Sequence, residues 1–194
     1  MQLVEKPRQL VPAGTHTGTL YRIIDLGTQE NETFKNKQRK VKFMFELPDE
    51  LMETGAPFSV SKTYTMSLSE KAQIVKDLKS WKGETPKSGF DISKLLGDSC
   101  NITISHDEGG NGKVYANIAS IAPLKKGEKK PAAINDQYIF DLEDYKEVIF
   151  QKLSDFDKEA IKKSPEYQNL GGAEQKPTYS AANEVPLPDD EIPF

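Results

Sequence analysis

The alternation of apolar and polar residues along the chain predicts five β-strands. The clearest example is residues 39–47, where the apolar positions fall on one face and Lys40, Lys42, Met44 and Glu46 on the other. Successive side chains of a strand point to opposite faces, so one face of this strand is expected in the core. The core positions are Val41, Phe43, Phe45 and Leu47. The strands are expected at residues 13–27, 39–47, 57–66, 100–106 and 113–121, with a loop over 28–38 after the first and Pro48 ending the second.

A helix is predicted between the third and fourth strands. Its buried stripe has the period of an α-helix and consists of Ile74, Val75, Leu78 and Trp81. Ser67 and Glu70 have the spacing of a capping box, which predicts a helix that starts close to them. Gly83 is expected to end it in a left-handed conformation. A short helical turn capped by Asp91 should precede the fourth strand.

This order of elements predicts a mainly β fold. Five strands with a helix between the third and fourth are the layout of an OB barrel, whose outer face and loops commonly bind oligonucleotides. A two-sheet sandwich with an added helix is the alternative, because periodicity does not distinguish the two. We expect a flexible arm over residues 1–12, followed by one OB-fold domain over 13–123.

The composition changes after Pro123. Residues 124–137 are rich in lysine and are expected to form a charged linker, and residues 138–169 a partly helical extension. Within the extension Ser154 is expected to cap a helix with Phe156, Ala160 and Ile161 on a narrow apolar stripe, and Pro165 to end it. The extension is expected to pack either on the barrel or on a second subunit. Residues 170–194 have the composition of a disordered tail.

Charge is distributed unevenly along the chain. Residues 1–130 contain 20 Lys/Arg and 16 Asp/Glu, a net charge of +4, whereas residues 131–194 contain 6 and 14, a net charge of −8. A basic body with an acidic tail is typical of a protein whose body binds a polyanion and whose tail binds a basic partner. No apolar run is long enough to span a membrane, and the polar N-terminus does not resemble a secretory signal. The single cysteine, Cys100, excludes an internal disulfide and is consistent with the cytoplasm.

A cluster of cations occupies the end of the first hairpin loop and the start of the second strand. Five positive residues occur without an intervening acid, namely Lys35, Lys37, Arg39, Lys40 and Lys42. The alternative is a solvated face that binds nothing. Single-strand binding also needs flat side chains on which bases stack. The candidates are Tyr21 beside Arg22, Tyr64, for which burial is the alternative, and Tyr115. Lys62 and Lys113 complete the predicted nucleic-acid site.

No catalytic or metal-binding motif is recognisable. The glycine-rich run that ends at Lys113 lacks the Ser or Thr that a phosphate loop needs next and precedes a strand rather than a helix, so it is expected to be a hairpin loop. His16 and His106 lack zinc-site spacing. We therefore expect a protein that is not an enzyme and that needs no metal or cofactor.

The last residues place three carboxylates before an apolar end. A basic, pocketed partner surface would suit this sequence, with lysines or arginines pairing with the carboxylates and a pocket for the phenyl ring. The segment resembles the acidic tip of bacterial single-stranded-DNA-binding proteins, which ends in two or three acids followed by Ile-Pro-Phe. Its residues are Asp189, Asp190, Glu191, Ile192, Pro193 and Phe194.

The body resembles the OB-fold single-stranded-DNA-binding proteins of bacteriophages and prophages. The similarity includes Pro12-Ala-Gly-Thr, the run Tyr21-Arg22-Ile23-Ile24-Asp25-Leu26-Gly27, Tyr64-Thr-Met-Ser-Leu-Ser-Glu-Lys-Ala, and Leu78-Lys-Ser-Trp81-Lys-Gly83. It implies sequence-independent binding and protection of single-stranded DNA in replication, recombination and repair, in the cytoplasm of a bacterial host. The tip would recruit replication and recombination proteins, and the protein would be a monomer or homodimer. The alternative is an interaction module whose barrel binds protein and which docks to host replication factors; a strand-annealing recombinase is a minor third possibility.

Overall fold

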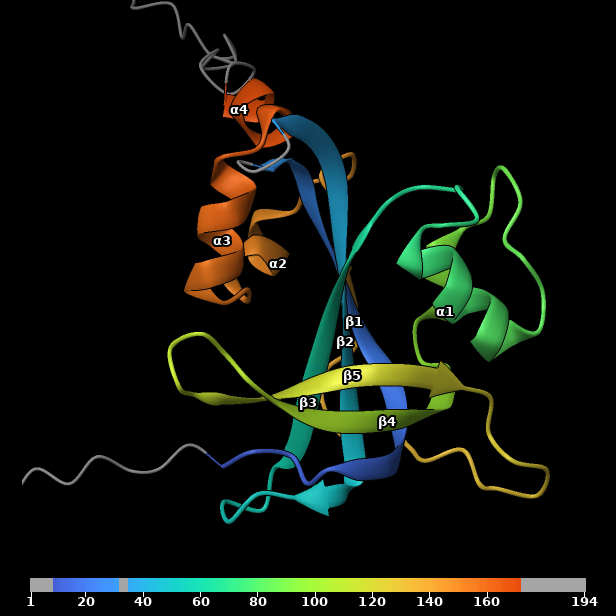
Figure 1. Cartoon of the computed structure of the whole chain (residues 1–194). Helices are drawn as coiled ribbons and strands as arrows, with labels where there is room; N and C mark the ends of the chain where they lie inside the picture. Colours follow the sequence, from blue (N-terminus) through green and yellow to red (C-terminus); the bar gives the residue numbers. More distant parts are fainter. Residues whose placement is uncertain (1–8, 32–34, 172–194) are drawn as a thin grey trace, which may run out of the picture.

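The structure is a computed structural model that describes residues 9–31 and 35–171 (Figure 1). Most of the expected arm, and the expected tail with its acidic tip beyond Gly171, lie outside the described residues. The elements are β1 (Gly14–Asn31), β2 (Asn36–Leu51), β3 (Pro57–Thr65), α1 (Gln73–Lys82), the 3-10 helix η1 (Ile92–Leu95), β4 (Ser99–Glu108), β5 (Val114–Ala122), β6 (Tyr138–Phe140), α2 (Glu147–Gln151), α3 (Asp155–Lys162) and α4 (Pro165–Gly171). All five predicted strands are present, and β6 is an unpredicted sixth.

The described strands form one open, mainly antiparallel sheet. Its order is β3-β2-β1-β4-β5, and β6 pairs in parallel with β1. The first residues of β1, 14–19, pair with β4, while 19–31 pair with β2, so one long strand belongs to both halves of the sheet. β3 and β5 approach each other at the two ends of this path, but no ladder between them is present among the described residues. The described strands thus form a single hydrogen-bonded sheet and not the two separate sheets of a sandwich.

The inner face of the sheet and α1 form the main core. The predicted faces of β2 and of α1 are both buried here, and Trp81 lies edge-on to Phe45 with 5.9 Å between ring centroids. Gly83 ends the helix with φ of 78°, as predicted. The predicted capping box is wrong: α1 begins at Gln73, and its N-cap Ala72 makes no side-chain hydrogen bond. The Ser67 hydroxyl instead accepts a hydrogen bond from the amide of Ser69, in the turn before the helix.

Several strand boundaries differ from the prediction, and the largest differences are in β1 and β2. β2 does not end at Pro48 but runs to Leu51, because its register is interrupted between Leu47 and Leu51 and Pro48 has no paired residue there. The expected loop over 28–38 is shorter, because pairing of β1 with β2 continues to Asn31 and Asn36. This polar ribbon extends beyond the core, so its side chains do not alternate with burial and its strand character is hard to recognise in the sequence.

The segment expected to be a linker is tied to the sheet. Glu128 accepts hydrogen bonds from the Thr17 hydroxyl and the Asn101 side-chain amide, at 2.9 and 2.8 Å. The fully buried Glu46 accepts one hydrogen bond from the amide of Ile134 and two from Asn135. Residues 124–137 therefore do not form a free linker. Each attachment joins residues that are far apart in the sequence, which composition alone does not reveal.

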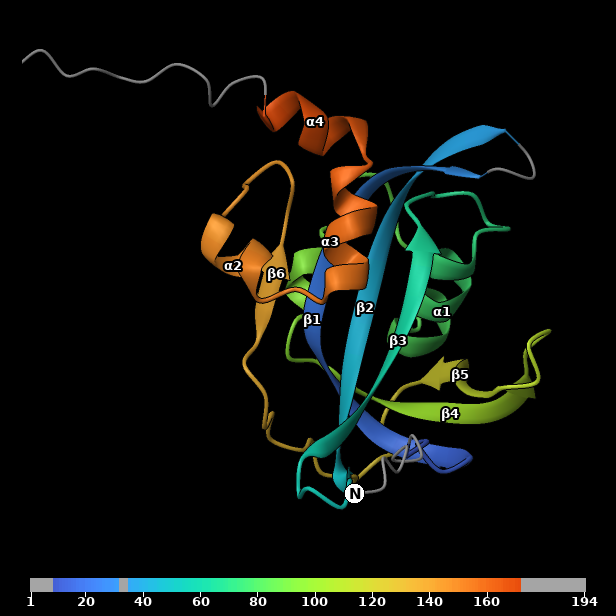
Figure 2. The ribbon, with the colours of Figure 1, turned by 90° about the vertical axis from the view of Figure 1, so that its left-hand side faces the viewer.

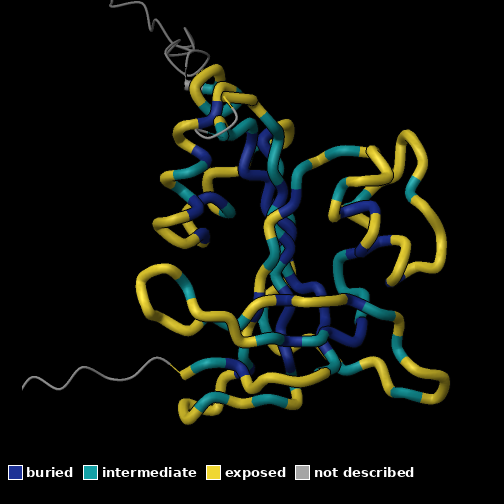
Figure 3. Tube along the Cα trace, in the orientation of Figure 1, coloured by how far each residue is buried: buried dark blue, intermediate teal, exposed yellow. Residues whose placement is uncertain are grey.

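The C-terminal segment from β6 to α4 covers the outer face of the sheet, on the side opposite α1 (Figures 1 and 2). It forms a second core with β1, whose buried members are Ile24, Leu26, Tyr138, Phe140, Leu142, Phe150, Leu153 and Ile161. Figure 3 shows buried stretches both on β1 and within this segment. The extension therefore packs on its own sheet. Ser154 caps α3 as predicted, accepting a hydrogen bond from the amide of Asp157.

Two details of the extension differ from the prediction. Phe156 is 77% exposed and so does not share the buried stripe with Ile161. Pro165 opens α4 rather than only ending the preceding helix, which suits a residue that lacks an amide proton. The junction of α3 and α4 lies against Gly27, whose φ is +69°, and a Cβ there would lie 2.5 Å from the Ser164 side chain. Glycine at position 27 thus permits the helices to approach β1.

Candidate nucleic-acid interface

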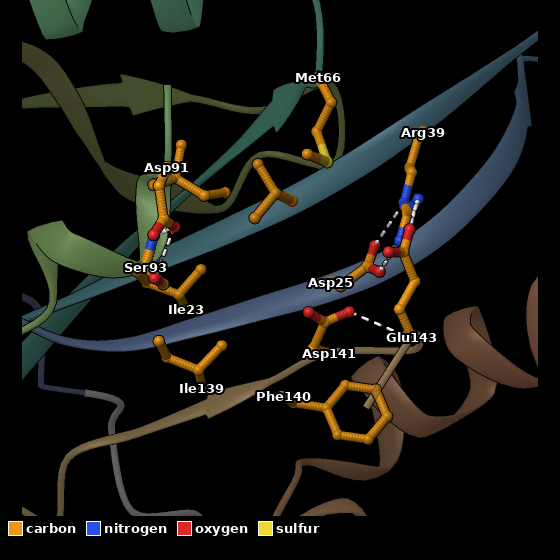
Figure 4. A pocket seen from close by; sticks show the side chains of 12 residues that line it. Ile23, Asp25, Arg39, Met66, Asp91, Ser93, Ile139, Phe140, Asp141 and Glu143 are labelled. Atoms are coloured by element: carbon orange, nitrogen blue, oxygen red, sulfur yellow. Dashed lines mark hydrogen bonds and ion pairs between the residues drawn. The ribbon is translucent and has the colours of Figure 1, made fainter. Parts of the chain in front are cut away.

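Arg39 of the predicted cation cluster is held by two carboxylates. Its Nη2 lies 2.6 Å from Oδ2 of Asp25, and its Nη1 lies 2.8 Å from Oε1 of Glu143 (Figure 4). The hydrogen bond that Arg39 donates to Asp25 is the main reason that the pKa of Arg39 is raised above its ordinary value; the bond to Glu143 raises it further, while desolvation lowers it. Glu143 lies 104 residues beyond Arg39, which is why the sequence cluster appears free of acids.

The other strand cations are also engaged within the protein. Lys42 lies 2.9 Å from the buried carboxylate of Asp157, and Lys62 lies 2.8 Å from that of Asp77. Lys40 donates to the side chains of Gln38 and Thr65. The five cations therefore do not form one free track. Lys35 and Lys37 remain exposed at the hairpin between β1 and β2, and Lys113 is exposed in the hairpin between β4 and β5.

Two of the three predicted stacking residues are buried. Tyr64 is 2% exposed, and its hydroxyl donates to Asp77 at 2.8 Å. Burial, followed by the neighbouring Asp77 charge, raises the pKa of Tyr64. Tyr21 is 3% exposed and makes a hydroxyl hydrogen bond of 3.1 Å to Ser59. Neither ring offers a free face to a base, which corrects both as stacking candidates.

Tyr115 is the predicted aromatic that lines an open cavity. It is half-buried on β5, and the side-chain amide of Asn111 donates to its hydroxyl at 2.8 Å. The cavity, of about 410 Å³, lies between β3 and β5. Phe58 of β3, which was not among the predicted site residues, lines it together with the polar side chains of Ser59, Ser61 and Asn117. The site therefore combines two aromatic rings with small hydrogen-bonding groups.

Arg22 is held between two aromatic rings. Its guanidinium carbon lies 4.7 Å from the ring centroid of Tyr21 and 4.6 Å from that of Tyr138. No carboxylate within the described ranges forms an ion pair with Arg22, and among these residues its buried Nε has no hydrogen-bond partner. The Tyr138 hydroxyl is likewise buried without a partner there, and burial is the main cause of its raised pKa. Arg22 is thus a positioned cation whose charge is not neutralised within the described fold.

Ser59 connects the cavity lined by Tyr115 with the site of Arg22. Its hydroxyl bonds to Tyr21, and its side chain also lines the cavity of Tyr115. Arg22 pairs with Met44, which packs in the second core, so it lies on the outer face of the sheet. In Figure 2 the strands β2 and β3 of this face remain uncovered beside α3. We call the connected residues the aromatic row: Tyr115, Phe58, Ser59, Tyr21, Arg22 and Tyr138.

The pocket in Figure 4 has a different character. Its volume is about 200 Å³, its apolar walls include Ile23 and Ile139, and its polar lining has four carboxylates against the single cation Arg39. The pKa of one of them, Asp91, is lowered by hydrogen bonds from Ser93. An anion would meet repulsion here, so this pocket is a poor phosphate site even though it contains a residue of the predicted cluster.

Residues 9–31 and 35–171 give little support to a metal site, a membrane-spanning helix or a reactive cysteine. No group of three His, Cys, Asp or Glu is arranged there to hold a metal, and none of the described helices has the length and apolarity to cross a membrane. Cys100 is fully buried, and burial raises the pKa of its thiol, which disfavours the reactive thiolate.

The chain matches no protein-family model and no curated protein sequence. Its function is therefore argued from the geometry of these residues.

Proposed function

We propose that this protein binds single-stranded DNA without sequence preference through the aromatic row. The observation that carries the proposal is Arg22, an un-neutralised guanidinium held against two tyrosine rings on the outer face of the sheet. The strand order and the position of α1 between β3 and β4 support it, because both are features of an OB fold. We further propose that β3 and β5 complete a closed barrel.

In the proposed mode of binding, cations contact the phosphates and aromatic rings stack on the bases. A guanidinium presents planar, forked donors that suit phosphate, and Arg22 keeps its orientation because both faces are occupied. Tyr115 and Phe58 provide ring surface for bases at the neighbouring cavity. Lys35, Lys37 and Lys113 are exposed on hairpins and add attraction to phosphates. Because every base has a flat face, such contacts do not select a sequence.

The attraction of phosphates, which the sequence assigned to the whole cation cluster, would thus fall to three exposed hairpin lysines. These are Lys35 and Lys37, which belong to that cluster, and Lys113 on the other hairpin. The residues of that cluster with internal partners, Arg39, Lys40 and Lys42, would instead stabilise the fold.

The acidic tip has a separate role in this proposal. Residues 189–194 would bind a basic, pocketed surface on replication, recombination or repair proteins, and thereby bring them to the covered DNA. The protein would act in a bacterial cytoplasm, as a monomer or homodimer, and as a binding protein rather than an enzyme. These assignments rest on the resemblance of the tip and body to phage single-stranded-DNA-binding proteins.

One observation favours a second candidate function. Arg39, Lys42 and Lys62 are all neutralised by carboxylates of the same chain, which leaves the sheet less basic than the sequence suggests. A barrel that binds a protein through the aromatic row, and docks to replication factors through its tip, needs no surplus of cations. In that function Arg22 would pair with an acidic residue of the partner.

Fluorescence anisotropy with a labelled oligothymidylate separates the two functions. Wild-type protein should bind it more tightly than a duplex of the same length, and affinity should fall as salt increases. Arg22→Ala should weaken binding about tenfold or more, the loss of one charged hydrogen bond. The control is Lys146→Ala, which should bind like wild type, because Lys146 is exposed and its ion pair in the described part of the chain is with nearby Asp144. Absence of wild-type binding at low salt would favour the protein-binding module.

A further inference from the structure

An apolar groove lies beside α1, on the side of the sheet opposite Arg22. It consists of two adjoining cavities of about 200 and 330 Å³ between α1 and the loop that follows it. Both are lined by Leu78, Pro86, Lys87, Gly89 and Phe90. Large side chains are left partly open to solvent here: Met66 is 43% exposed, Leu68 53% and Phe90 42%. We call this surface the α1 groove.

Lysines border the groove. Lys82 and Lys87 line its second cavity, where Glu84 is the accompanying carboxylate. Lys82 pairs with Asp98, but Asp98 is shared with Lys130 at 3.6 Å, so this trio keeps one positive charge in excess. Lys79 is exposed on the same helix, one turn before Gly83. The groove therefore suits a ligand that combines apolar side chains with negative charge.

The chain carries a segment with that composition. Asp189, Asp190 and Glu191 are followed directly by Ile192 and, after one proline, by Phe194. The apolar pair matches the exposed walls of the groove, and the three carboxylates match its lysines. The connecting chain is long, because the 23 residues after Gly171 would span up to about 75 Å if extended and about 27 Å on average as a random coil.

We propose that the α1 groove is a binding site for residues 189–194 of this same chain. Ile192 and Phe194 contact the walls formed by Leu68 and Phe90, and the carboxylates pair with Lys82 and Lys87. The site lies against the inner core, whereas Arg22 lies on the outer face and Tyr115 lines a different cavity, so an occupied groove leaves both uncovered. The proposal does not depend on DNA binding, since its evidence comes from a different face of the molecule.

The test uses a fluorescein-labelled peptide of residues 186–194 and the full chain carrying Ile192→Ala and Phe194→Ala, whose own tip no longer competes. We expect the peptide to bind saturably, and to bind more weakly to the parent chain, whose intact tip competes. Binding should also change the emission of Trp81, because its ring lies 4.5 Å from Nζ of Lys82. Adding Lys87→Glu or Phe90→Ala to the host should weaken binding at least fivefold. Lys113→Glu, the same charge reversal on the β4–β5 hairpin, should change it less than twofold.

Two further measurements distinguish docking from charge attraction and from other occupants. A peptide that keeps its acids but has Ser in place of Ile192 and Phe194 should not bind. Both groove variants alter exposed loop residues, so their Tm should stay near that of the parent. Equal binding to all host variants, or no binding, would overturn the proposal. So would concentration-dependent dimerisation that Phe90→Ala abolishes but the tip variant leaves intact, because the occupant would then be the body of a second copy.

Discussion

The guanidinium of Arg22 stacks on Tyr138, with 4.6 Å between its central carbon and the ring centroid. The two residues lie on paired strands, since Arg22 of β1 is the register partner of Tyr138 of β6. The C-terminal extension thus contributes a ring to a site that otherwise belongs to the first 123 residues. It also covers part of the outer face with its own core. The extension would therefore cover part of the outer face and, through Tyr138, supply one ring of the surface that we propose for DNA.

Arg22→Lys should bind single-stranded DNA nearly as weakly as Arg22→Ala. A lysine keeps the charge but has neither the planar group that fills the space between two rings nor the forked donors. We expect a loss of about tenfold relative to wild type, measured by anisotropy at one fixed salt concentration. If lysine restores wild-type affinity, the site requires only a positive charge, and the stacked geometry has no role in binding.

Tyr115→Ala should weaken binding, whereas Tyr115→Phe should not. Base stacking contributes about 1–3 kcal/mol per base, so loss of the ring should weaken binding by about 5-fold to about 150-fold. Within the described residues the hydroxyl accepts a hydrogen bond from Asn111 of its own hairpin alone, and Phe retains the stacking surface. The same titration applies to both variants. Similar losses in both would point to the hydroxyl or to the hairpin conformation instead of the ring.

Lys42→Met should reduce stability more than DNA affinity. Its partner Asp157 is 2% exposed, and removal of one member of a buried ion pair costs about 3–5 kcal/mol because the other charge stays buried. Urea unfolding should show a lower midpoint, while the folded protein should bind the oligonucleotide within about twofold of wild type. A large loss of DNA affinity at unchanged stability would contradict this prediction and would indicate that Lys42 contacts DNA.

The strands and α1 could be predicted because local periodicity determines them. Alternation located the buried face from Val41 to Leu47, and the helical stripe located Leu78 and Trp81. Both signals arise within a few residues of sequence. β6 could not be recognised, since a three-residue strand has almost no period and forms only because β1 is present to pair with it.

The candidate site was less predictable, because it too depends on contacts between residues that are far apart in the sequence. Whether a cation is free depends on acids that folding brings to it: Asp157 is 115 residues from Lys42, and Glu143 is 104 from Arg39. Tyr21 and Tyr64 have the residue type and strand position of stacking groups but are buried by other segments. Arg22 was predicted for its position next to Tyr21, whereas Tyr138, its second ring, was not, because no local pattern relates residues 22 and 138.

Acidification should loosen the attachment of α4 to β1. Glu166 accepts hydrogen bonds from the amide and hydroxyl of Thr28. Desolvation raises the pKa of Glu166, but these hydrogen bonds outweigh it, and the folded-state pKa lies below the ordinary value of a glutamate. A depressed pKa means that the carboxylate contributes stability above its unfolded pKa, and that this contribution is lost as pH falls through the folded pKa.

We therefore expect the amide of Thr28 to stay protected from hydrogen exchange at neutral pH and to lose protection below about pH 4.5, after correction for the intrinsic exchange rate. Glu166→Gln should show low protection at both pH values, because a neutral amide is a weaker acceptor than a carboxylate. The amide of Ile23, in the centre of β1 and 2% exposed, provides the internal reference. Parallel loss at Ile23 and Thr28 would indicate global unfolding and would contradict a local release of α4.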